Sequence, residues 1–199
     1  MIRRLPIIAT LVVLAAAGTM VALGIWQLQR AEWKADLIAR YQAALSDKAP
    51  VAFPRAGSAD SEVILYRRSQ VDCSRGASGW ASIAGRNRGG EVGYVHIATC
   101  GDAAVQLGWS RNPNPPGDWE GGEAAGVIVP YGEDAVRLVA DPPLAGLEAS
   151  AAPDPADMPN NHLAYAVQWF FFALTALVIY ALAVRKRLRA ELAERRGED

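Results

Sequence analysis

Two long stretches without charged side chains constrain the fold of this 199-residue chain more than any other feature. The first lies between Arg4 and Arg30, and the second lies between Asp157 and Arg185. A helix crosses a bilayer with about 20 predominantly apolar residues, and each stretch is long enough to do so. The pattern excludes a many-span transporter, an ordinary cytosolic globule and a disordered chain. The predicted transmembrane helices are residues 7–28 and 163–184.

Charges beside the predicted spans indicate how the chain crosses the membrane. The tail 1–6 holds two arginines, and the tail 185–199 holds six basic residues against four acidic ones. The stretch from Gln29 to His162 holds 12 Lys and Arg against 17 Asp and Glu. Because basic residues beside a span favour the cytoplasmic side, we expect both termini in the cytoplasm and the middle domain in the periplasm. The lack of a Ser- and Arg-rich transit peptide favours a bacterial inner membrane over a mitochondrial one.

The first span has an alternative interpretation as a cleavable signal peptide. Two arginines precede it, and Ala15–Ala17 resembles a cleavage site. The apolar run nevertheless continues to Leu28, which is too long for a signal peptide and typical of an uncleaved anchor. Trp33, Leu37 and Tyr41 keep helical spacing beyond it, so we expect the helix to continue to about residue 45.

Between the spans, short apolar runs alternate with turn residues rich in Gly and Pro. Short strands at such spacing are typical of small barrels and sandwiches. We therefore predict a small antiparallel all-β domain, barrel- or sandwich-like, within residues 46–161, which also include linkers. The predicted strands are residues 63–71, 80–86, 92–99, 104–111, 126–131 and 135–139.

Cys73 and Cys100 are the only cysteines, and both fall in the predicted periplasmic domain. An even number of cysteines in an oxidising compartment indicates a disulfide. The two are too far apart for a CxxC redox motif, and neither has a second metal-ligating residue at a suitable spacing. We therefore predict a structural disulfide rather than a copper or redox pair.

Catalytic motifs are missing from the sequence. It has no P-loop, HExxH motif, dinucleotide fingerprint or nucleophile elbow. Ser82, His96 and Asp102 are a conceivable triad, but any chain of this length offers such a set by chance, and His96 lies in a predicted strand. We expect a protein that is not an enzyme and that has no nucleic-acid partner.

The most informative residues lie where both spans reach the outer membrane surface. Trp and Tyr prefer this interface without any further role. Arg30 and Lys34 are harder to explain, because like charges four residues apart on a helix repel each other. An anion between them accounts for both: a lipid phosphate, or the propionates of a haem whose axial ligand is His162. Residue chemistry alone favours lipid. The candidate site residues are Trp26, Gln27, Arg30, Lys34, His162, Tyr165, Gln168 and Trp169.

Three motifs of the chain are similar to those of the Surfeit locus protein 1 family. The first span ends in Gly24-x-Trp26-Gln27-Leu28-x-Arg30, followed by Lys34. The second begins with Asn161-His162-Leu163-x-Tyr165-Ala166-x-Gln168-Trp169-Phe170. Between them, Val105-x-Leu107-Gly108-Trp109 resembles a central strand of the family.

This resemblance implies an assembly factor for haem-copper terminal oxidases, particularly cytochrome c oxidase. It implies that haem a is bound, with His162 as the candidate iron ligand, and presented to the catalytic oxidase subunit. We expect the haem to be held transiently. Haem a synthase is a further expected partner. Leu107 stands where the family usually has Arg, and the two cysteines lie outside the family pattern. The alternative function is a membrane-anchored periplasmic adaptor that recruits oxidase subunits without binding haem.

Small residues indicate how the two spans contact each other. Close approach through small side chains gives van der Waals packing that lipid cannot match. The residues expected at this contact are Gly18 and Ala22 on the first span and Ala166, Ala173 and Ala176 on the second.

Overall fold

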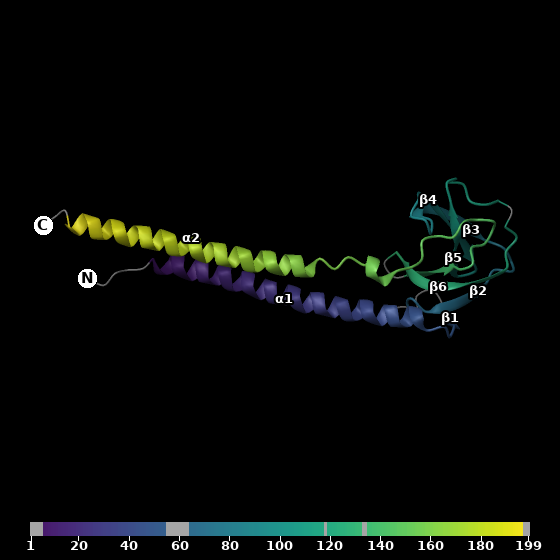
Figure 1. The fold of residues 1–199 in the computed structure, drawn as a ribbon, viewed down its shortest axis with the longest axis horizontal. Helices are drawn as coiled ribbons and strands as arrows, with labels where there is room; N and C mark the ends of the chain where they lie inside the picture. Colours follow the sequence, from purple (N-terminus) through teal and green to yellow (C-terminus); the bar gives the residue numbers. More distant parts are fainter. Residues whose placement is uncertain (1–5, 55–63, 118, 133–134, 197–199) are drawn as a thin grey trace. The chain divides into compact units, whose positions relative to one another are not determined.

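The computed structural model describes residues 6–54, 64–117, 119–132 and 135–196, and Figure 1 shows its elements. The chain divides into two compact units. The helical unit comprises the residues up to Leu37 together with those from Pro159 onward, and the β unit comprises Ile38–Met158. The helix α1 (Ile7–Ser46) contributes to both units, and α2 (His162–Arg196) belongs to the helical unit.

The helical unit carries apolar side chains on its outside. The most apolar 18 residues reach a mean hydropathy of 2.3 in Ile7–Ser46 and 2.1 in Pro155–Ala193. Large side chains such as Leu11 and Leu163 are more than half exposed. The core helix of a soluble protein would bury such residues. Both helices are therefore long and apolar enough to span a membrane, as the two charge-free stretches predict.

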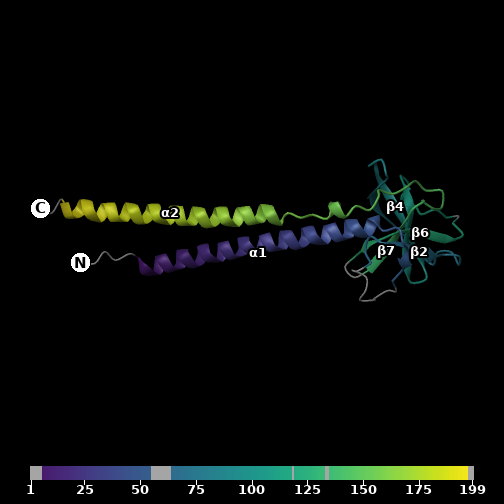
Figure 2. The ribbon, with the colours of Figure 1, turned by 60° about the horizontal axis from the view of Figure 1, so that its bottom comes forward.

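Helices α1 and α2 lie side by side and run in opposite directions (Figures 1 and 2). Small residues are buried seven positions apart on each helix: Ala17 and Gly24 on α1, Ala166 and Ala173 on α2. At Gly24, a Cβ atom would lie only 2.6 Å from Cε1 of Phe170, so the ring of α2 occupies the space that the glycine leaves. The seven-residue repeat is the spacing by which two helices keep one seam in contact.

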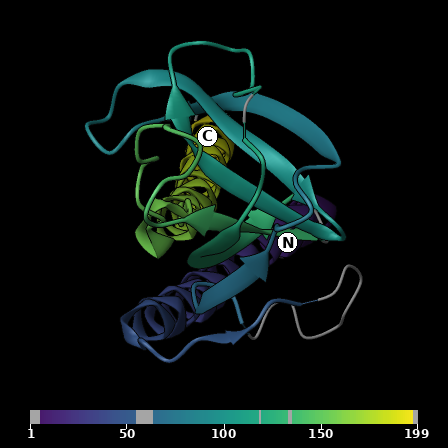
Figure 3. The ribbon, with the colours of Figure 1, turned by 90° about the vertical axis from the view of Figure 1, so that its right-hand side faces the viewer.

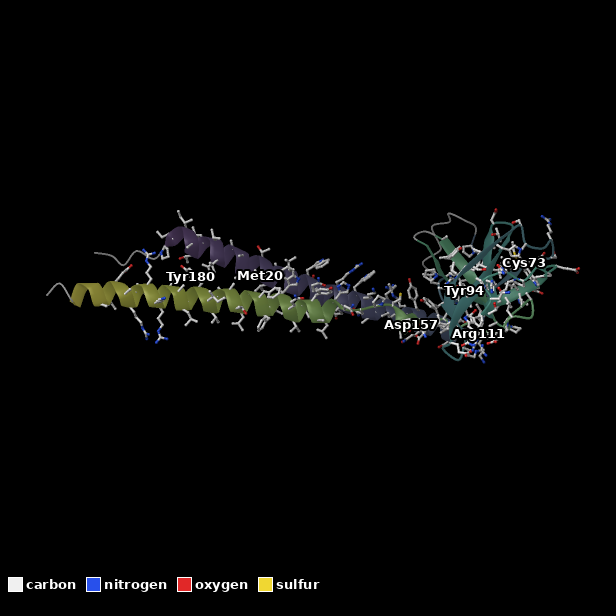
Figure 4. All side chains as sticks on the ribbon, turned by 90° about the horizontal axis from the view of Figure 1, so that it is seen from above. Met20, Cys73, Tyr94, Arg111, Asp157 and Tyr180 are labelled. Carbon is white, nitrogen blue, oxygen red and sulfur yellow. A yellow bond between two sulfur atoms is a disulfide. The ribbon has the colours of Figure 1, made fainter. Side chains whose placement is uncertain are left out.

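The prediction of which α1 residues contact α2 was therefore wrong by about one residue around the helix. Gly18 and Ala22 are exposed, because they lie outside the stripe defined by positions 17 and 24. Further along the same contact, the hydroxyl groups of Thr10 and Tyr180 form a hydrogen bond. Figure 4 labels Tyr180 and Met20 between the two ribbons.

The β unit is built on one seven-stranded sheet in the order β1-β2-β6-β7-β5-β4-β3. The sheet is strongly twisted and curled (Figure 3). A short 3-10 helix, η2 (Pro155–Asp157), precedes the return to the helical unit. The strands are β1 (Val51–Ala52), β2 (Arg68–Asp72), β3 (Gly79–Arg86), β4 (Val92–Cys100), β5 (Ala103–Ser110), β6 (Glu123–Tyr131) and β7 (Ala135–Ala140).

The sheet is mixed, so the prediction of an antiparallel all-β domain was wrong in this respect. β7 runs parallel to β5, with Val105 opposite Leu138, and β1 runs parallel to β2. The cause is the long Pro-rich connection after β5, which lets β6 pair with β2 instead of β5. β7 lies between β6 and β5, where it pairs antiparallel with β6 and parallel with β5.

The first predicted strand of this domain also starts later than expected. Residues 64–66 form a turn, and Tyr66 has a φ of 62°, so the strand begins at Arg68. Val63, the predicted first residue, lies outside the described residues.

The core of the β unit lies against β4–β7. Its largest fully buried side chains include Leu107, Trp109, Ile128 and Leu138. Leu107, at the position where the resemblance expects Arg, is thus a core residue. The predicted disulfide is present: Cys73 follows β2, Cys100 ends β4, and their Cα atoms are 5.2 Å apart.

Candidate functional site

The helical unit brings two of the candidate residues into direct contact. His162 is the first residue of α2, and Gln27 lies on the stripe of α1 that faces α2. Gln27 follows Gly24 by three residues and Ala17 by ten, so helical spacing places it on the same side of α1. Nδ1 of His162 lies 2.7 Å from Oε1 of Gln27.

This hydrogen bond indicates which tautomer the neutral imidazole of His162 adopts. A carbonyl oxygen can only accept, so Nδ1 of His162 carries the proton and donates it to Gln27. In the neutral ring Nε2 then has a free lone pair, which is the form of histidine that binds a metal. Metal-bound histidines almost always donate their other ring N–H to an oxygen acceptor, which orients the ring. Gln27 is in the position to play this role for His162.

A second polar contact lies one turn further along α1. Nδ2 of Asn160 donates to the backbone carbonyl of Ala31 at 3.2 Å. The side-chain oxygen of Asn160 is buried and has no hydrogen-bond partner within the described part of the chain. A buried polar atom without a partner is uncommon in native proteins and indicates a site for water or a polar ligand group.

The two basic residues differ in their surroundings. Lys34 follows Gln27 by seven residues and Ala31 by three, which places it on the same stripe of α1 but beyond the start of α2, and it is half-buried. Arg30 is exposed, and its guanidinium carbon lies 3.8 Å from the ring centroid of Trp33. The cation–π contact with Trp33 was missed at the sequence level, although the spacing of three residues on a helix permits it. Arg30 thus lies at the flank of the stripe.

The aromatic candidates are divided in the same way. Trp169 follows His162 by seven residues, is half-buried, and packs edge-on against Phe172 at 6.2 Å between ring centroids. Trp26 and Tyr165 are 53% and 52% exposed, so their rings face the surroundings of the helices. Gln168 is exposed and lies about 120° around α2 from His162, at 100° per residue. The structure therefore brings Gln27 and His162 into contact and places Lys34 and Trp169 seven residues away from them, in opposite directions along the contact, while Gln168 lies off it.

The conceivable triad in the β unit does not form. Nδ1 of His96 lies 2.9 Å from Oγ of Ser82, and Nε2 lies 2.8 Å from Oγ of Ser110. His96 has no exposed surface, and Asp102 is exposed in the turn after β4. Burial lowers the pKa of His96, so the neutral ring is the stable form at neutral pH. This histidine is a hydrogen-bonded core residue that no substrate can reach.

The family model of the SURF1 family matches residues 14–174, a range that includes both end motifs and the whole β unit. The chain belongs to the SURF1 family. This family is associated with the assembly of cytochrome c oxidase. No curated protein matches the chain.

The resemblance noted in the sequence is therefore confirmed, and the family's second motif falls on the element that positions His162. The contact between His162 and Gln27 was not foreseen, although both residues were candidates. A seven-residue pattern through positions 17, 24 and 31 would have indicated that Gln27 faces α2.

Proposed function

We propose that this protein is an assembly factor that binds haem a between α1 and α2 and passes it to the catalytic subunit of a haem-copper oxidase. Membership of the SURF1 family supports a function in cytochrome c oxidase assembly. The proposed place of action is the periplasmic surface of a bacterial inner membrane. Haem a synthase, as the source of the haem, and membrane lipid are the further proposed partners.

The hydrogen bond between His162 and Gln27 is the observation that carries the haem proposal. In the neutral ring it places the proton on Nδ1, so that Nε2 carries the lone pair, and it orients the imidazole, which suits a ligand of haem iron. The residues that would hold the haem are His162 at the iron, Trp169 against the ring, and Lys34 and Arg30 at the propionates. Bound haem a would supply the iron centre and the anionic propionates that these residues complement.

The basic residues support the same proposal through their charge. Bonds between a cationic side chain and a carboxylate are about twice as strong as neutral hydrogen bonds. Lys34 lies on the stripe with Gln27 and is half-buried, so its ammonium group is less screened than one in open water. Arg30 is the more exposed of the two, and its guanidinium group is held against the Trp33 ring by the cation–π contact.

The proposal predicts a specific loss on substitution of His162. The protein is purified in nanodiscs from cells that make haem a, and its visible absorption spectrum is recorded. We expect His162→Ala to abolish or shift the haem band and to lower the haem a content of the oxidase, while the protein still inserts. An unchanged spectrum in His162→Ala would remove the ligand assignment and favour the adaptor function.

Gln27 and Gln168 offer a matched pair for the same measurement. Gln27→Leu removes the acceptor that orients His162 and should reduce haem retention by about tenfold, the lower end of the effect of losing a partner that orients a metal ligand. Gln168→Leu makes the same chemical change on the exposed face of α2 and should leave the spectrum unchanged. Equal effects of the two variants would contradict the proposed orientation of the imidazole by Gln27.

A further inference from the structure

A pocket of about 240 Å³ lies in the β unit, on the face of the sheet opposite its core. Strand register places Gln106 of β5 opposite Val139 of β7, and Arg137 of β7 opposite Val129 of β6. These four side chains share one face, because Leu138 between Arg137 and Val139 is fully buried on the other. The residues that line the pocket are Tyr66, Gln106, Val129, Pro130, Arg137, Val139, Ala151 and Pro153.

Arg137 is a cation without a carboxylate partner in the described part of the chain. Its guanidinium carbon lies 5.2 Å from the ring centroid of Tyr131, which covers one face of the group. Its Nε atom is buried and has no hydrogen-bond acceptor among the described residues. Burial lowers the pKa of Arg137, and the aromatic neighbour offsets this only in part. Within the described residues this guanidinium has a buried Nε atom and no anionic partner, and a carboxylate would supply the acceptor that is missing there.

Gln106 adds a second unsatisfied group to the same pocket. It is 4% exposed, and its Oε1 atom has no hydrogen-bond partner within the described residues. A buried amide oxygen in this state loses free energy that the O–H of a bound water would restore, since a carboxylate ligand carries no donor. Arg137 and Gln106 lie on adjacent strands, because β7 and β5 are neighbours in the sheet.

Tyr66 forms part of the wall and is held there by an unusual backbone. Its φ of 62° lies in the left-handed region, which is strained for a non-glycine residue and is found at ligand clamps. Burial, followed by the charges of Tyr41, Asp154 and Asp157, raises the pKa of Tyr66. Its hydroxyl group is protonated at neutral pH, as that of an ordinary tyrosine is.

We propose that this pocket binds a small organic carboxylate with an apolar body. The guanidinium of Arg137 receives the carboxylate, and Val129, Pro130, Val139 and Pro153 contact the apolar part. A volume of about 240 Å³ is below the roughly 300–1,000 Å³ of sites for drug-sized ligands, so the ligand is short. The site lies wholly within the β unit and is independent of the proposed haem site on the helices.

The test uses the full-length protein in nanodiscs and three probes, with empty nanodiscs as a blank. Titration calorimetry and ligand-observed NMR compare 3-methylbutanoate, its uncharged analogue 3-methylbutanamide, and inorganic phosphate. We expect saturable binding of the carboxylate only. Equal binding of the amide would show that charge is irrelevant, and preferred binding of phosphate would show a different anion class; either result overturns the proposal, as does the absence of carboxylate binding at millimolar concentration.

Three variants locate the site. Arg137→Met should weaken carboxylate binding by about tenfold or more, because it removes the charge-assisted hydrogen bonds. Arg75→Met is the matched control, since Arg75 is an exposed arginine of the same unit outside the pocket, and it should bind as the original protein does. Gln106→Glu keeps the size of the side chain and supplies a carboxylate from within the protein, so it should also abolish binding. Unchanged binding in Arg137→Met or in Gln106→Glu overturns the proposal.

Discussion

Each of the two histidines illustrates how neighbours decide the chemistry of one residue type. His96 has hydrogen bonds at both ring nitrogens, so neither nitrogen is left for a ligand. Oγ of Ser110 donates to the carbonyl of Asn112, so it accepts from Nε2 of His96, and Ser82 donates to Nδ1. His162 has one acceptor, Gln27, and keeps Nε2 without a partner in the described residues. The same side chain is therefore a structural group in β4 and a candidate ligand at the start of α2.

The buried state of His96 predicts how the stability of the β unit depends on pH. The pKa of His96 is lower in the folded protein than in the unfolded chain, where it is about 6.5. Below that pH the unfolded chain therefore binds a proton that the folded protein excludes. The contribution of the neutral His96 to the free energy of unfolding should thus be complete above pH 6.5. It should decrease as the pH drops from there toward the folded pKa. Urea unfolding followed by near-ultraviolet circular dichroism between pH 7.5 and 5.5 measures this decrease.

Variants of the two histidines separate their contributions to this pH dependence. His96→Gln removes the titrating group and should flatten the free energy of unfolding over this range, whereas His162→Ala should keep the original slope. An equal slope in His96→Gln and in the original protein would assign the pH dependence to another group.

At the scale of the elements, Gly24 is the residue on which the packing of α1 against α2 depends most directly. A methyl group there would meet the ring of Phe170, with Cε1 at 2.6 Å and Cζ at 2.8 Å. Gly24→Ala should therefore push the helices apart locally, at a cost of about 1–3 kcal/mol for overpacking. Gly18→Ala is the matched control, because a Cβ atom at Gly18 meets nothing within 4 Å.

Cross-linking measures this effect without unfolding the protein. Thr10→Cys and Tyr180→Cys place thiols at a contact between the helices, and Cys73 and Cys100 do not compete because they are joined. A bismaleimide should cross-link the helices less efficiently in Gly24→Ala than in Gly18→Ala. Replacing the ring in Gly24→Ala/Phe170→Leu should restore the yield. Identical yields for both alanine variants would contradict close packing at Gly24.

Comparison of the predicted with the observed elements shows which parts of the fold can be predicted from the sequence. The strands β3 to β7 were predicted to within a few residues, because alternation and Gly-rich turns are local signals. The parallel pairing of β5 with β7 was not predictable in this way, because it depends on which strand β6 joins after the Pro-rich connection. The phase of α1 was missed for a similar reason: Gly18 looks as suitable as Gly24 until the partner ring of Phe170 is known. The contact of Gln27 with His162, 135 residues apart in sequence, follows from that phase.

For the whole molecule, the strongest signals in the sequence are hydropathy and charge. Both properties are sums over many residues, so an error about a single residue does not change the predicted spans or their orientation. The apolar surfaces of α1 and α2 are left uncovered by protein, and the β unit has its own buried core. This division is what a chain with two spans and one water-exposed domain requires. By contrast, the Arg137 pocket is invisible in the sequence, because its members come from three strands and two connecting segments.

The distribution of charge predicts the orientation of the whole molecule in the membrane. Six basic residues follow the second span against four acidic ones, and the stretch from Gln29 to His162 has an excess of five acidic residues, 17 against 12. The basic tail should stay in the cytoplasm, which places the β unit, with its disulfide, in an oxidising compartment. A green fluorescent protein fused after Asp199 should fluoresce, and an alkaline phosphatase inserted after Gly117 should be active. As a control, exchanging the two reporters should silence both. Active phosphatase after Asp199 would reverse the topology, and with it the placement of His162 at the periplasmic surface.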